Sequence, residues 1–140
     1  MTRILLSLSL FFFSFSLFSQ VNTGVKKDSI IKENNLKGKQ WDAWYTLDST
    51  WTHHIFPGCL NENHLKLSCA DCSKIYLTVQ LSIDSTGKLV SHKKISSIMC
   101  GDGMSIKMEK CLLDFFYFIE FPSTLRNIIL EVKVGNGLKC

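Results

Sequence analysis

Alternating apolar and polar residues mark a strand near the middle of the chain. From Ile75 to Ile83 every odd position is apolar, while the even positions hold Tyr, Thr, Gln and Ser. This period of two is typical of an antiparallel strand that buries one face and leaves the other in water. Asp-Ser-Thr-Gly-Lys follows at 84–88, and we expect a hairpin loop there in which Gly87 takes a positive φ. The returning strand is expected over 89–98.

A period of three and four residues follows the hairpin and predicts an amphipathic helix on one face of the sheet. Its apolar members are Met104, Met108, Cys111, Leu112, Phe115 and Ile119. Ser105 or Asp102 is expected to cap this helix, and Pro122 ends it. A last alternating segment at 128–134 predicts a third strand. The fold class is therefore α+β, with a small antiparallel sheet of about three strands and one amphipathic helix packed on it.

The region ahead of the first strand carries large aromatic residues and a turn signal. Trp41, Trp44, Tyr45 and Trp51 supply area that a small domain is expected to bury. Pro57-Gly58 predicts a turn just before Cys59. Structure is therefore expected to begin at Trp41.

The N-terminal residues divide into two further segments. Residues 4–18 contain only Ile, Leu, Phe and Ser and follow Arg3, which predicts a secretory signal peptide over residues 1–19. The alternative is a retained membrane anchor, but an apolar core of about 15 residues is shorter than the roughly 20 that span a bilayer. Residues 20–40 are polar and predict a flexible leader. The domain is expected over residues 41–140, periplasmic or secreted, with no transmembrane helix after signal cleavage.

The cysteine content is high for 140 residues, and all six cysteines lie beyond the signal segment. They are Cys59, Cys69, Cys72, Cys100, Cys111 and Cys140. Export favours three disulfides, whose connectivity the sequence leaves open. Cys100 and Cys111 flank the turn from strand to helix and form a plausible pair. A bridge from Cys140 would hold the last strand in place.

Two other uses of these cysteines stay open. Cys69 and Cys72 form a Cys-x-x-Cys pair, although it precedes a strand instead of beginning a helix as in thioredoxin-type sites. A zinc site is the second alternative, because zinc accepts cysteine and histidine ligands. Its candidate ligands are His53, His54, Cys59, His64, Cys69 and Cys72.

Charge and motifs argue against several classes of function. With 16 basic and 12 acidic side chains, the formal charge of +4 lacks the dense basic patch of a nucleic-acid-binding protein. No Gly-x-Ser-x-Gly nucleophile motif and no glycine-rich phosphate loop occurs. His92 lies among lysines on a strand and is expected on a solvated face. We therefore expect no enzyme activity and no cofactor.

The predicted hairpin resembles that of the TonB C-terminal domain. In that family an alternating strand leads into an Ile-Asp-x-x-Gly-Lys turn, as at residues 83–88 here. Phe121-Pro122 ahead of the last strand also fits, and Phe56-Pro57-Gly58-Cys59 is similar to a stretch ahead of this domain in many Bacteroidetes members. The resemblance covers roughly residues 55–138. The chain departs from it at residues 69–72, where the family has a small helix, and in having only two prolines and no proline-rich spacer.

The resemblance implies a stand-alone exported domain of TonB-C-like two-layer fold, a binding or structural module instead of an energy transducer. In such domains a sheet edge near the last strand pairs with an extended partner segment, here from an envelope or outer-membrane protein. By resemblance, the segment nearest that edge carries Arg126, Ile128, Leu130, Val132 and Val134. The edge could be exposed or covered by the protein's own leader. The alternative is a small disulfide-stapled secreted protein with a Cys/His metal site.

Overall fold

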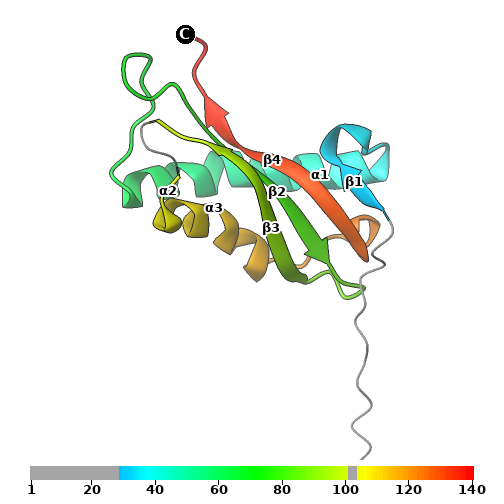
Figure 1. The fold of residues 1–140 in the computed structure, drawn as a ribbon. Coiled ribbons are helices and arrows are strands. Elements are labelled where there is room, and N and C mark those ends of the chain that lie inside the picture. The colour runs from blue at the N-terminus through cyan, green and yellow to red at the C-terminus, as the bar shows by residue number, and fades with distance from the viewer. Residues whose placement is uncertain (1–28, 101–103) are drawn as a thin grey trace, which may run out of the picture.

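Helices cover one face of a four-stranded sheet, and the described residues leave the other face open (Figure 1). This computed structural model describes residues 29–100 and 104–140. The predicted signal peptide and the candidate cap Asp102 lie outside these ranges. The strand order is β1-β4-β2-β3, so the α+β class is confirmed.

The central hairpin agrees with its prediction. Strand β2 (Lys74–Ile83) buries every odd residue from Ile75 onward, and it pairs antiparallel with β3 (Leu89–Ile98). Gly87 has a φ of 89° in the connecting loop. A Cβ atom there would lie 2.6 Å from the backbone oxygen of Phe121, so glycine is required by space as well as by conformation.

The sheet is mixed and has four strands, which corrects the prediction of about three antiparallel strands. Strand β4 (Ile128–Gly137) is the predicted last strand, and it pairs antiparallel with β2. On its other side β4 pairs in parallel with the short β1 (Ile30–Lys32). Because β1 and the 3₁₀ turn η1 (Glu33–Asn35) belong to the segment predicted as a flexible leader, ordered structure begins earlier than Trp41. Ile31 explains this, since it packs against the hydrophobic core.

A long helical run crosses behind the sheet, where the sequence predicted aromatic burial and a turn (Figure 1). It comprises α1 (Lys39–Thr50), the π-helical segment η2 (Trp51–Ile55) and α2 (Phe56–Glu62). The predicted turn at Pro57-Gly58 is wrong, because both residues lie in α2, directly after the π-helical segment and within the continuous helical run. No helix within residues 29–100 and 104–140 is long and apolar enough to cross a membrane.

The second helix, α3 (Ile106–Phe118), lies beside this run on the same face of the sheet. Ser105 caps it as predicted: its Oγ accepts a hydrogen bond of 3.2 Å from the Met108 amide. The buried residues are Met108, Leu112, Leu113 and Phe116. Phe115 and Ile119 pack at the border of the core instead of its centre. A 3₁₀ turn, η3 (Ser123–Leu125), then leads to β4.

Phe116 stands at the centre of an aromatic cluster that joins the two helical layers. Its ring lies 6.0 Å from Trp44, 6.5 Å from Trp51 and 6.2 Å from Phe121, measured between ring centroids. The Trp51 indole N–H donates a buried hydrogen bond of 2.9 Å to the Leu112 carbonyl. This bond fixes the helical run against α3.

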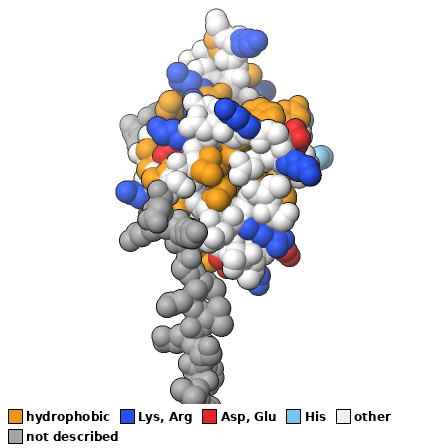
Figure 2. Space-filling model, turned by 90° about the vertical axis from the view of Figure 1, so that its right-hand side faces the viewer, with side chains coloured by type: hydrophobic (Ala, Val, Ile, Leu, Met, Phe, Trp, Pro, Cys, Tyr) orange, Lys and Arg blue, Asp and Glu red, His pale blue; other side chains and the backbone are white. Residues whose placement is uncertain are grey.

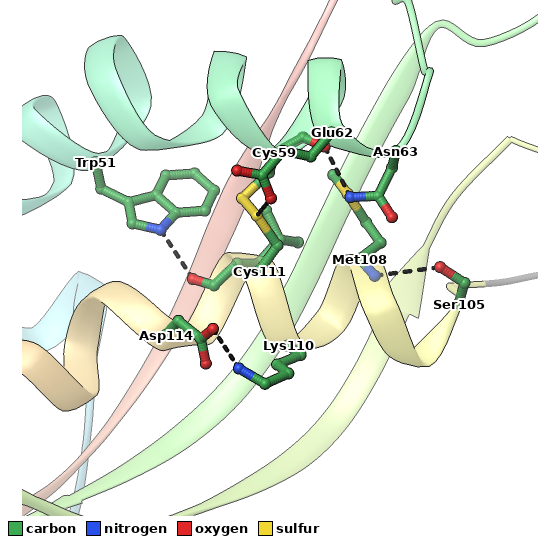
Figure 3. The surroundings of a disulfide bond; sticks show 10 residues. Trp51, Cys59, Glu62, Asn63, Ser105, Met108, Lys110, Cys111 and Asp114 are labelled. Carbon is green, nitrogen blue, oxygen red and sulfur yellow. Dashed lines mark hydrogen bonds and ion pairs between the residues drawn. A yellow bond between two sulfur atoms is a disulfide. The ribbon is translucent and has the colours of Figure 1, made fainter.

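Three disulfides use all six cysteines. Cys59–Cys111 joins α2 to α3 (Figure 3), Cys69–Cys140 joins the segment before β2 to the last residue, and Cys72–Cys100 joins the two ends of the hairpin. Three bridges are therefore confirmed, but the Cys100–Cys111 pair is wrong. Cys111 faces α2 from within α3, whereas Cys100 lies 4.7 Å from Cys72 between Cα atoms. Cys140 pins the last strand, as predicted.

Candidate protein-binding edge

The segment named by the TonB-C resemblance lies inside the sheet and not at its border. Leu130, Val132 and Val134 point their side chains into the core, and β4 has neighbours on both sides. Ile128 is half-buried, and Arg126 holds the loop by donating to the Phe121 carbonyl at 3.0 Å. Of the two states that the sequence left open for this edge, the structure has it covered by the leader.

Two contacts secure that cover. β1 pairs Ile30, Ile31 and Lys32 with residues 129–131 of β4. One residue further on, the Glu33 carboxylate accepts a hydrogen bond of 3.1 Å from the Lys133 amide. This amide marks the outer side of β4, so Glu33 occupies the next backbone donor that an added strand would need.

A small groove of about 350 Å³ lies where β1 leaves β4. Trp41 of α1 forms one wall, next to Glu33, Asn34, Val132 and Lys133. Figure 2 views the molecule from the side of β1 and η1 and shows apolar side chains there with lysines around them. The described residues leave the short end of β4 beyond Lys133 open here, where the Gly137 amide donates to the side chain of Asn136.

The opposite border of the sheet is different, because within residues 29–100 and 104–140 β3 has a neighbouring strand on one side only. β3 is ten residues long. No hydrogen bond between described residues reaches the backbone groups on its outer side. Bulges interrupt its pairing with β2 between Thr78 and Val79 and between Ser82 and Ile83. An exposed strand border of this length is the place where another strand can add.

A groove of about 420 Å³ runs between β3 and α3. Leu113 lies at its floor and is buried, while Ile106 and Tyr117 line it and are 88% and 44% exposed. His92 of β3 reaches across, with 2.7 Å between its Nδ1 and the Tyr117 hydroxyl. The groove thus holds three apolar or aromatic side chains of α3 and directly adjoins the open edge.

Charged side chains line the same groove in pairs. Lys94 of β3 forms an ion pair of 2.6 Å with Glu109, and Lys110 pairs with Asp114 one turn further along α3. Lys93, the neighbour of Lys94, makes no ion pair with any described residue. It lies opposite Gln80 in the β2–β3 register, so its side chain belongs to the open face of the sheet.

A third groove, of about 560 Å³, lies between α2 and α3. It includes Cys111 of the Cys59–Cys111 disulfide, which Figure 3 shows. Phe115 and Phe118 line it together with Lys107 and Glu62. The Glu62 carboxylate comes within 3.6 Å of the Cys111 sulfur. This contact is not a hydrogen bond, because a disulfide sulfur carries no proton. Cys111 therefore gives this groove no free thiol.

The cysteine and histidine tract predicted as a metal alternative does not come together. Its three cysteines each pair with a cysteine elsewhere in the chain. Within the described residues no cluster of His, Cys, Asp and Glu has the geometry to hold a metal ion. The Cys69–Cys72 pair likewise forms two separate bridges instead of one.

Two carboxylates have displaced pKa values, and both have structural causes. Burial, followed by the nearby Glu33 charge, raises the pKa of Asp48, while His53 opposes the shift. The Thr86 hydroxyl, followed by the Lys88 amide, donates to Asp84 and lowers its pKa. Asp84 thereby serves the hairpin loop, the role expected of a turn residue.

Comparisons with family profiles, with curated proteins and with solved structures find no match to this chain. The TonB-C resemblance therefore stays a prediction from its short motifs.

The groove residues on α3 were missed at the level of sequence. Ile106, Tyr117 and Phe118 fall outside the three- and four-residue stripe that predicted the buried face. Large apolar residues outside such a stripe are themselves the signal, because a helix that only covers a core has no need of them.

Proposed function

We propose that this protein is an exported, non-enzymatic binding module that recognises an extended segment of an envelope protein by β-strand pairing. The observation that carries this proposal is the outer side of β3, ten residues long and without a backbone partner among the described residues. Added strands gain affinity from backbone hydrogen bonds and specificity from pockets beside the edge. The groove along α3 supplies such a pocket.

Export is supported by the cysteines. All six are in disulfides, and such bridges persist in the periplasm and outside the cell. A periplasmic or secreted location fits an envelope partner.

The proposed edge differs from the one implied by the TonB-C resemblance. β1 covers β4 at residues 129–131, and Glu33 bonds the next amide. A partner at β4 must first displace these contacts, whereas a partner at β3 displaces none among the described residues. We therefore place the partner strand at β3.

Photo-crosslinking joined to hydrogen exchange tests this proposal. Benzoylphenylalanine replaces Ile95 on β3 in one variant and Tyr45 on α1 in a control, since both side chains are exposed. We expect the Ile95 variant to crosslink an envelope protein in living cells. The purified partner should then slow amide exchange along β3. Crosslinking from Tyr45 alone, or a partner that leaves β3 exchange unchanged, would contradict strand pairing at this edge.

A further inference from the structure

The β3–α3 groove and the charges beside it define the chemistry of the segment that fits there. A strand added to β3 places alternate side chains on the two faces of the sheet. One set points toward α3 and the other toward the open face. The two faces of this border carry different side chains. The partner strand must therefore have one kind of residue at its odd positions and another at its even positions.

The helix side of the border takes apolar side chains. Leu113 is buried at the floor, and Ile106 and Tyr117 stand exposed at the walls. The cations on this side are already neutralised, because Lys94 pairs with Glu109 and Lys110 with Asp114. A valine or leucine of the partner that enters here buries apolar surface of Ile106 and leaves no charged side chain buried without its ion-pair partner.

The open-face side takes an acidic side chain. Lys93 is exposed, lies on that face and lacks an ion pair among the described residues. Residues directly opposite on neighbouring strands have Cβ atoms about 5 Å apart, close enough for opposite charges to attract. A glutamate at the matching partner position therefore pairs with Lys93.

A second copy of this chain fits the border poorly. Two β3 strands that pair antiparallel about their centre bring the same residue of the two copies face to face, either Lys93 opposite Lys93 or Lys94 opposite Lys94. Like charges directly opposite each other are destabilising. Lysine at an exposed strand border is a common means of preventing self-pairing.

We propose that β3 and α3 together bind an extended segment in which apolar and acidic residues alternate. This inference rests on the proposed function. The apolar residues lie against Ile106, Leu113 and Tyr117, and an acidic residue lies opposite Lys93. The partner is thus an acidic amphipathic strand from another protein, held by backbone hydrogen bonds along β3.

Fluorescence anisotropy with model peptides tests this inference on protein purified from the periplasm with its disulfides intact. The probes are a short blocked peptide of alternating valine and glutamate, and the same length of alternating valine and lysine. We expect the glutamate peptide to bind about fivefold more tightly, the size of one favourable cross-strand charge pair. N-methylation at alternate amides of the glutamate peptide should abolish its binding.

Two variants with the same charge change separate the proposed site from general attraction. Lys93→Glu should reverse the preference between the two peptides. Lys107→Glu is the control: Lys107 lies on α3 but lines the other groove, so the preference should persist. Ile106→Asp should weaken both peptides.

The outcomes distinguish this inference from the broader proposal. The acidic specificity is overturned if neither peptide binds, or if Lys107→Glu has the same effect as Lys93→Glu. The broader proposal still stands in that case if an envelope protein slows amide exchange along β3. If the glutamate peptide binds but no envelope protein protects β3, the inference holds and the envelope function fails. Self-association through β3 would overturn the inference.

Discussion

The two buried tryptophans differ in the partner of a single atom. Trp51 donates its indole N–H to the Leu112 carbonyl, whereas the Trp44 indole N–H is buried with no partner among the described residues. Both rings stack on Phe116. A buried donor without a partner costs free energy, so Trp51 contributes more through its polar atom than Trp44 does.

Replacing each tryptophan by phenylalanine separates these roles. Trp51→Phe leaves the Leu112 carbonyl without this donor and should lower the free energy of unfolding by about 2–4 kcal/mol, from lost packing and a broken buried bond. Trp44→Phe loses a similar ring area but also removes an unpaired donor, so the loss should be smaller. Urea unfolding of both variants measures the difference. Equal losses would contradict the role assigned to the Trp51 hydrogen bond.

Asp84 couples the hairpin loop to pH. Its pKa is lowered below 3.8 in the folded protein, so its contribution to stability is present above that value and is lost as the pH falls through the lower folded pKa. Asp84→Asn should therefore be less stable than the parent at neutral pH, and the gap should narrow on acidification below 3.8. Urea midpoints measured across this range test the shape of the curve.

Thr86→Val is the matched control for Asp84. It removes the hydroxyl donor, the largest cause of the shift, but keeps the amides of Thr86 and Lys88. We expect a pH dependence between those of the parent and Asp84→Asn. A constant gap between parent and Asp84→Asn at all pH values would show that the lost interaction does not depend on charge.

At the scale of elements, regular local periodicity was the reliable guide. The hairpin strands, the capped helix and the start of the last strand agree with their predictions, because each buries one face at a fixed period. The helical run over 39–62 was missed. Pro57-Gly58 reads as a turn in sequence, but both residues lie in α2 within the continuous helical run. Trp41 and Tyr45, expected to be buried, stay exposed on α1.

The C-terminal end of β4 is held by a disulfide whose pairing could not be predicted from the sequence. Cys69–Cys140 closes a span of 71 residues, and the Leu138 amide bonds Ser73 at 2.7 Å beside it. Cys69→Ser/Cys140→Ser should lower the free energy of unfolding by about 4 kcal/mol in the chain-entropy model for a span of 71 residues. Amide exchange should quicken at residues 136–138 in particular. Urea unfolding and hydrogen exchange measure the two effects.

The Cys59–Cys111 bridge provides the comparison. It closes 52 residues and lies between α2 and α3. Cys59→Ala/Cys111→Ala should therefore quicken exchange in α2 and leave residues 136–138 as they are. If both double variants loosened the same segment, the assignment of each bridge to its own element would be wrong.

At the scale of the molecule, the features that escaped prediction are those joining distant parts of the chain. β1 meets β4 about a hundred residues later in the sequence, with Glu33 bonding Lys133. A strand of three residues is too short to show the hydrophobic periodicity from which such a contact could be predicted. Cysteine pairing is likewise set by the final fold, and six cysteines allow many pairings. The candidate partner edge is β3 instead of β4 for the same reason: the contact of β1 with β4 was not predicted from sequence.

The charge at the centre of β3 should keep the protein monomeric. Lys93→Val removes a lysine from an exposed strand border that already carries Val90 and Ile95 as exposed apolar residues. We expect the parent to have the mass of one chain by light scattering, and the variant to self-associate as its concentration rises. Lys107→Val, which changes the same charge on α3, should stay monomeric. A dimeric parent would contradict this account.

The three bridges also decide what happens to the protein after a protease has cut it. They span 59–111, 69–140 and 72–100, and these intervals overlap. Any single cut between Cys59 and Cys140 therefore crosses at least one disulfide, and the two pieces stay joined. A domain exported as proposed meets proteases where the cell cannot resynthesise it. Cleavage of one peptide bond between Cys59 and Cys140 therefore releases no fragment. The strands of the sheet stay covalently linked after such a cut.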